Sequence, residues 1–288
     1  MGNATGGSLY SRDRTNDTVL YVLPGSQFVS KVLTALDALE FPYRVVEVQT
    51  SRMKDDLEPP HSVPQMKWKD GSLITDSSDI LKALDQDGSG AFKLYPEGKA
   101  AEVEELEQQI GTVLNAHVLY FTWWVEEGYK ASYERKIREQ VLFPALFMPG
   151  DQVTGRMRGS YRKKARAVVG EELIPPGREP GPDEEANMKA SLLKEVRTFE
   201  ACFSSEGQPF LFPGATPTAA DFALYGILER LVGDEGDGDM GTATPWLFAE
   251  ANVPRLQAWH TRMRDKYPIQ FLGKGDKCKV WKSNWSKL

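Results

Sequence analysis

The sequence is poor in the residues that build cross-linked or metal-bound folds. Only two of its 288 residues are cysteines, Cys202 and Cys278, and both stand outside any CxxC or CxxH pattern. A disulfide framework or a structural zinc site needs several suitably spaced thiols or imidazoles, so neither is expected. The three histidines, His61, His117 and His260, also lack metal-ligand spacing. We therefore expect a protein of a reducing compartment without a bound metal.

Long apolar runs and an excess of positive charge are also missing. Residues 141–148 form an apolar run too short to cross a bilayer, and the first residues contain no signal-peptide core. The net charge of −6 argues against a general nucleic-acid binder. An apolar content of 41% and a charged content of 26% are ordinary for a globular protein. The length suits one large domain or two modest ones.

The first half of the chain has the order β-α-β, a connection, and then β-β-α. Short runs of β-forming residues alternate with helical spacing of apolar side chains, and Pro42 ends the first helix. Asp76 and Ser77 open the last helix as a cap of short oxygen side chains. The expected strands are residues 18–23, 43–48, from 63, and 73–75, and the expected helices begin at 26 and 76. This order predicts a small mixed sheet with helices on its faces.

The second half of the chain is predicted to be helical. Residues 86–98, with their Gly, Ser and Pro, form a plausible linker, and a long amphipathic helix is expected from Lys99. Thr218 and Asp221 fit a capping box, which gives Asp221 a structural role. The expected domains are a disordered lead at 1–17, a mixed domain at 18–86, an all-helical domain at 99–270 and a tail at 273–288.

Residues 130–166 form a basic insertion in the helical half. They hold ten Lys or Arg side chains against three acidic ones. The ordinary interpretation is a solvated helix face. The alternative is an anion site for a carboxylated or phosphorylated substrate.

The first half resembles the N-terminal domain of the glutathione transferase superfamily. The shared features are a strand, a Pro-Gly loop that opens a helix, a Val-Pro before the third strand and a D-S cap. The run FVSKVLTALDALEFPYRVVEV is closest to the type-2 membrane-associated prostaglandin E synthase branch. That branch has a C-P-x-C pair, where Ser26 and Val29 stand here. The resemblance implies an α+β thioredoxin-like N-terminal domain followed by an all-α helical C-terminal domain, whose hallmark PFLFPGATPTAAD is present.

A glutathione transferase must lower the pKa of the glutathione thiol, which a hydroxyl donor and a helix N-terminus can both do. Ser26 stands at the start of the first helix, where the two would meet. Ser26 could equally serve only as the cap of that helix. Tyr21 is the alternative hydroxyl, because some transferase classes use a tyrosine near the end of the first strand. Tyr21 could also belong to the core.

The resemblance also implies residues that hold the tripeptide. Val63 would pair with its backbone beside a cis-Pro64, and Asp76 and Ser77 would hold the γ-glutamyl group. Lys54 and His61 are candidate partners for the glycyl carboxylate.

An aromatic stretch near residue 120 has two interpretations. Tyr120, Trp123 and Trp124 could form an ordinary aromatic core stripe. They could instead wall an apolar substrate pocket that faces the first domain.

Two functions of different class follow from the resemblance. The first is a glutathione-dependent transferase that uses the thiolate to conjugate, isomerise or reduce a small apolar electrophile. Loss of both cysteines of the C-P-x-C pair argues against disulfide chemistry. The second is a catalytically silent transferase-fold protein used for binding or assembly. A homodimer is possible in either case, since dimers are common in the family.

The printed sequence ends in Ser286, Lys287 and Leu288. S-K-L at a free carboxyl terminus is read by the peroxisomal import receptor, so a peroxisomal protein is expected, with the cytoplasm as the alternative. A Lys- and Trp-rich tail could also contact a membrane surface, but it shows no clear amphipathic helix.

Overall fold

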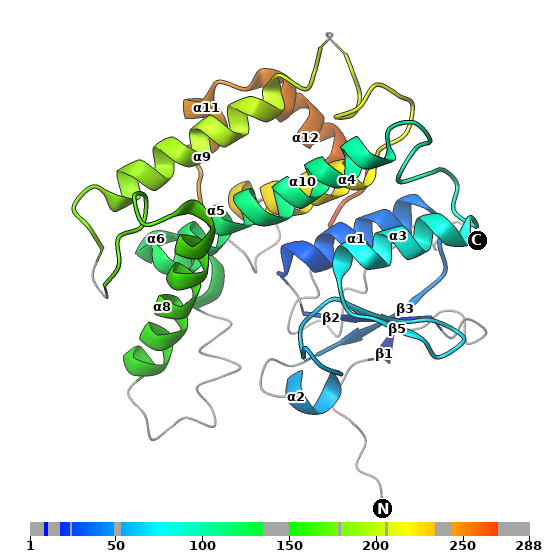
Figure 1. Cartoon of the computed structure of the whole chain (residues 1–288), viewed down its shortest axis with the longest axis horizontal. Coiled ribbons are helices and arrows are strands. Elements are labelled where there is room, and N and C mark those ends of the chain that lie inside the picture. The colour runs from blue at the N-terminus through cyan, green and yellow to red at the C-terminus, as the bar shows by residue number, and fades with distance from the viewer. Residues whose placement is uncertain are drawn as a thin grey trace, which may run out of the picture.

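The computed structural model describes residues 9–10, 18–23, 25–48, 53–134, 150–177, 180–204, 207–233 and 243–269. They form a mixed α/β domain followed by a helical domain (Figure 1). The elements of the first domain are β1 (Leu9–Tyr10), β2 (Val19–Val22), α1 (Gln27–Ala38), β3 (Arg44–Glu47), α2 (Met53–Asp56), β4 (Gln65–Lys67), β5 (Leu73–Ile74) and α3 (Ser77–Asp87).

The five strands form one mixed sheet in the order β1-β3-β2-β4-β5. Strand β2 is central and runs parallel to β3, whereas the pairs β1–β3, β2–β4 and β4–β5 are antiparallel. Helices α1 and α3 cover the same face of this sheet (Figure 1). The mixed sheet with helices predicted from the order of elements is therefore confirmed, as is the thioredoxin-like arrangement that the resemblance implied. Strand β1 falls in the lead that was expected to be disordered, and no sequence pattern predicted it.

Helix α1 is buried on both of its flanks. Ser26 caps it, and Val32 and Leu36 are fully buried in one continuous core with Leu20 of β2 and Met66 of β4. The other flank packs against a helix of the second domain. The helix ends at the residues before Pro42, as its position in the sequence predicts.

The helical domain opens with a long rod from Ala100 to Trp124, where a long helix was expected. Two wider π-type turns interrupt the rod. The elements of the domain are α4 (Ala100–Gln109), η2 (Ile110–Leu114), α5 (Asn115–Leu119), η3 (Tyr120–Trp124), α6 (Glu126–Tyr129), η4 (Lys130–Glu134), α8 (Gly150–Val169), α9 (Glu184–Glu200), α10 (Ala219–Val232), α11 (Leu247–Ala251) and α12 (Pro254–Lys266).

Helix α10 joins the two domains. Almost all of its residues are buried, and it packs against α1 along that helix's second flank. Gly226 allows this approach, because a Cβ at this position would lie 2.6 Å from the carbonyl oxygen of Gln27. The predicted capping box of Thr218 and Asp221 is present at its start.

No helix in the described ranges is both long enough and apolar enough to cross a bilayer. The tail at residues 273–288 lies outside these ranges, as does nearly all of the lead.

Candidate functional site

Ser26 lies between the end of β2 and the first turn of α1. Its side-chain oxygen accepts a hydrogen bond from the backbone N–H of Val29 at 3.4 Å, so the serine caps the helix. Its backbone N–H donates to the carbonyl of Leu23 at 3.2 Å, which fixes the loop. The hydroxyl proton of Ser26 has no acceptor among the residues that the structure describes. The half-buried hydroxyl can therefore still donate to a ligand at the positive end of the helix.

Tyr21, the alternative hydroxyl, lies on the other face of the sheet. Leu20 and Val22 face the core under α1 and α3, and the alternation of a strand places Tyr21 opposite to them. Tyr21 is half-buried and stands opposite Gln65 of β4. The geometry thus separates the two hydroxyl candidates by face, and only Ser26 stands at a helix N-terminus.

The Val63–Pro64 peptide bond is cis, as the resemblance implied. Gln65, two residues after Val63, pairs with Tyr21, so Val63 lies near the end of β2 from which the chain continues to Ser26. Neither the N–H nor the C=O of Val63 forms a hydrogen bond with another described residue. This backbone is therefore open for pairing with an extended peptide beside Ser26.

Asp76 and Ser77 open helix α3 on the same side of the sheet as α1. One carboxylate oxygen of Asp76 accepts the N–H groups of Ser78 and Asp79, at 2.7 and 3.3 Å, so Asp76 is the N-cap. The exposed carboxylate keeps its second oxygen for another partner. Ser77 is buried, and its hydroxyl oxygen lies 3.2 Å from the ammonium of Lys31 on α1.

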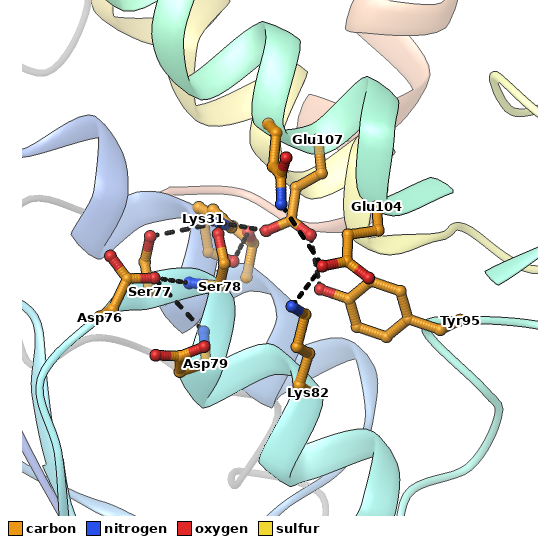
Figure 2. A network of polar contacts seen from close by, with 11 residues as sticks. Lys31, Asp76, Ser77, Ser78, Asp79, Lys82, Tyr95, Glu104 and Glu107 are labelled. Carbon is orange, nitrogen blue, oxygen red and sulfur yellow. Dashed lines mark hydrogen bonds and ion pairs between the residues drawn. The ribbon is translucent and has the colours of Figure 1, made fainter. Parts of the chain in front are cut away.

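Lys31 is the centre of a buried polar network that the sequence did not predict (Figure 2). Its ammonium donates to the hydroxyl oxygens of Ser77 and Ser78, the latter at 2.9 Å, and forms an ion pair with Glu107 of α4. The phenol of Tyr95 donates to the other oxygen of Glu107. Burial lowers the pKa of Lys31, and the charge of Glu107 opposes this shift. The network thus connects the start of α3 to the helical domain.

A sequence signal for this pair existed. Glu107 stands at helical spacing with the buried residues Val103, Ile110 and Leu114, and Lys31 interrupts the apolar face of α1. A charged residue at a core position is rarely buried without a partner of opposite charge. Two charged residues of opposite sign at core positions predict a buried ion pair. Their spacing in the sequence alone does not show that Lys31 and Glu107 are in contact.

The two candidates for the glycyl carboxylate differ in what they can donate. Lys54 lies on α2 and is exposed. The Nδ1 atom of His61 lies 2.7 Å from the carbonyl oxygen of Leu57, so this nitrogen carries the proton. Its other nitrogen can then donate to a carboxylate only when the ring is charged. Lys54 carries three ammonium donors and is therefore the better candidate of the two.

The aromatic stretch is divided between core and cleft. Trp123 is buried and stacks on Tyr161 with 4.2 Å between ring centroids, as the core interpretation has it. Tyr120 is buried in the main core and, with the half-buried Trp124, borders a cleft of about 1190 Å³. All lining residues of this cleft come from the helical domain, mainly from η3, α6, α8 and the loop before α9. A pocket that faces the first domain therefore stays a prediction.

The basic insertion is described only at residues 130–134 and 150–166, and this part is not entirely a solvated face. Arg162 of α8 is buried and forms an ion pair with Glu184 of α9, with 2.8 Å between Nε and a carboxylate oxygen. Arg158 donates to the backbone carbonyls of Trp123 and Trp124 at 3.0 and 2.7 Å. These two arginines attach α8 to the domain. Lys163 and Lys164 are exposed, as the solvated-face interpretation predicts.

Within the described part of the chain, no three His, Cys, Asp or Glu side chains gather where they could hold a metal ion. The acidic stretch at residues 234–239 lies outside that part.

Comparison with known proteins agrees with this arrangement. The family model described as "Glutathione S-transferase, N-terminal domain" matches residues 20–91. The model described as "Glutathione S-transferase, C-terminal domain" matches residues 182–262. Together they cover α1, α3 and the sheet apart from β1 and the first residue of β2, and helices α9 and α10 with most of α12. No curated protein matches the chain.

Solved structures share most of the fold at low sequence identity. An apo mutant of human glutathione-S-transferase T1-1 is 19% identical, with a TM-score of 0.57, and the match covers 87% of this chain and 84% of the other. The beta-etherase LigF from Sphingobium sp. strain SYK-6 is 18% identical, with a TM-score of 0.56 and coverage of 86% and 94%. The two domain matches, the order of elements and the shared fold together show that this chain belongs to the glutathione transferase superfamily.

Proposed function

We propose that the protein binds glutathione and transfers its thiolate to a small electrophile, with Ser26 as the hydroxyl that stabilises the sulfur. The observation that carries this proposal is the placement of Ser26 at the N-terminus of α1, at the same end of β2 as the open backbone of Val63. A peptide paired with Val63 would present its cysteinyl sulfur to the first turn of α1.

Thiolate formation would draw on two contributions. The unpaired N–H groups at the start of α1 favour a negative charge. The Ser26 hydroxyl uses a lone pair to cap the helix, and its proton is free to donate to the sulfur. Capping and catalysis are thus compatible roles of one oxygen.

The γ-glutamyl end would be held at the start of α3. The free carboxylate oxygen of Asp76 suits the glutamyl ammonium, and the hydroxyl of Ser77 and the helix N-terminus suit its carboxylate. Lys54 is the proposed partner of the glycyl carboxylate.

Nucleophilic transfer is favoured over disulfide exchange, because Ser26 and Val29 stand where the related branch has its two cysteines. An exchange reaction needs a protein thiol to form the mixed disulfide. The second candidate function is binding without catalysis, by the same site. A site without a hydroxyl to stabilise the thiolate would bind glutathione without catalysis. Because the hydroxyl proton of Ser26 is free to donate, the site favours catalysis over binding alone.

Titration calorimetry with glutathione tests the binding, and conjugation to an activated aromatic halide tests the chemistry. Ser26→Ala should lower kcat by about tenfold or more with little change in glutathione affinity, because a donor to the developing charge is lost. Ser26→Asp is the matched control for capping, since aspartate caps as well as serine but has no proton to donate. It should melt like the wild type and lose at least as much activity as Ser26→Ala, because its negative charge also opposes the thiolate.

Full conjugation activity in both Ser26 variants, with Tyr21→Phe inactive, would transfer the role to Tyr21. Tight glutathione binding without conjugation of any electrophile tried would instead favour the binding protein.

A further inference from the structure

The start of α3 holds hydroxyl groups whose hydrogen bonds are incomplete. Ser77 is 7% exposed, and its oxygen accepts from Lys31. Ser78 accepts from the same ammonium at 2.9 Å. Neither hydroxyl proton has an acceptor among the described residues. A buried hydroxyl that accepts from a cation has its own proton directed elsewhere, toward an acceptor that the chain does not supply.

Lys31 determines this orientation. An ammonium has three N–H groups and no lone pair, and Lys31 has three acceptors around it, on Ser77, Ser78 and Glu107. Because all three donors are used, both serine oxygens are fixed as acceptors toward Lys31. Their protons are left to serve as donors.

Glu107 holds Lys31 in place from the other domain. Its side chain is fully buried, and the Tyr95 phenol donates to it, so the carboxylate itself has a fixed position (Figure 2). The charges of Lys31 and Glu107 neutralise one another. The pair therefore orients the hydroxyl groups of Ser77 and Ser78 without adding net charge to the site. The Lys31–Glu107 ion pair therefore links the helical domain to the serines at the start of α3.

We propose that Lys31 is a positioning residue for glutathione, which sets Ser77 and Ser78 to donate to the α-carboxylate of the γ-glutamyl group. The inference rests on the proposed binding of glutathione. Lys31 itself does not contact the ligand and acts through the two serines. Glu107 is the part of the helical domain on which this recognition depends.

The variant that tests the proposal must keep the fold. Lys31→Met alone would leave Glu107 as an unpaired buried charge, so the double variant Lys31→Met/Glu107→Gln removes both charges together. The matched control is Lys82→Met/Glu104→Gln, which removes a different ion pair with α4, formed by the half-exposed Lys82 of α3 and Glu104. That pair does not contact either serine. Circular dichroism and thermal melting confirm that both variants are folded.

Calorimetry then compares glutathione with 4-aminobutanoyl-cysteinylglycine, which is glutathione without the α-carboxylate. The wild type and the control should prefer glutathione by the same factor. The Lys31/Glu107 variant should bind glutathione about tenfold more weakly and bind the analogue almost unchanged, so that its preference largely disappears.

An equal loss for both ligands would show a merely structural role and overturn the proposal, as would an unchanged preference for glutathione. A wild type that binds no glutathione at millimolar concentration would overturn the proposed function and this inference with it. The first two results leave the proposed function standing.

Discussion

At the scale of single residues, His117 is a buried base whose charge the fold excludes. It is 0% exposed, with Nδ1 at 2.9 Å from the carbonyl of Val113 and Nε2 at 3.0 Å from the hydroxyl of Ser191. A neutral ring satisfies both contacts, by donating through Nδ1 and accepting through Nε2. Burial lowers the pKa of His117 to about 4 from an ordinary value of 6.5.

The lowered pKa of His117 makes the free energy of unfolding depend on pH. Between pH 6.5 and about 4 the unfolded chain takes up a proton at His117 and the folded protein does not, so acid favours unfolding. The contribution is complete above pH 6.5 and should lose about 2 kcal/mol by pH 5. Urea unfolding at pH 7.5 and 5.0 measures it. In His117→Gln the loss over this interval should be smaller by that amount, and an identical loss would contradict the buried neutral ring.

Asp221 was predicted from the sequence as half of a capping box, and the structure gives it more partners. One oxygen accepts from the N–H and the hydroxyl of Thr218, both at 2.8 Å. The other accepts from the N–H of Leu211 at 2.8 Å and the indole of Trp259 at 3.0 Å. The carboxylate is fully buried, so it fixes the start of α10 to a preceding loop and to α12.

At the scale of elements, Asp221→Ala should therefore cost more than the loss of a helix cap. Several buried donors would be left without an acceptor, at roughly 1–3 kcal/mol for each group, so we expect a loss of at least about 3 kcal/mol. Chemical denaturation measures it. Thr218→Ala, which removes one of the four bonds, is the milder control and should lose roughly 1 kcal/mol. Folded Asp221→Ala should keep its glutathione affinity, and a stable but inactive variant would refute the structural role.

The regular elements were predictable because their signals are local. Periodicity, Pro42, the Asp76 cap and the Thr218–Asp221 box placed β2, α1, α3 and α10 within a few residues. The Lys31–Glu107 pair was not predicted, because it joins positions 76 residues apart and depends on how two domains dock. The ion pair of Arg162 with Glu184 was not predicted for the same reason. In the sequence Arg162 is one of many basic residues of the insertion, and only the fold places Glu184 of α9 beside it.

At the scale of the whole molecule, we propose that Ser286, Lys287 and Leu288 direct the protein to peroxisomes. These residues lie outside the described ranges, so the proposal rests on the sequence alone. A fluorescent protein fused to the N-terminus, with Leu288 left free, should give a punctate peroxisomal signal. Deleting the three residues should make it diffuse. A distribution that the deletion does not change would falsify the assignment, and a diffuse one would favour the cytoplasm.

Helix α1 has a consequence for how the molecule can be divided. One of its flanks belongs to the core of the first domain, and the other is covered by α10 around Gly226, where the two backbones come close together. A fragment cut in the connection between α3 and α4 would expose that second flank to water, together with the ammonium of Lys31. The connection between α3 and α4 separates the two domains in the sequence, but we do not expect either domain to be stable without the other. The two halves should form one cooperative unit, which melts in a single transition.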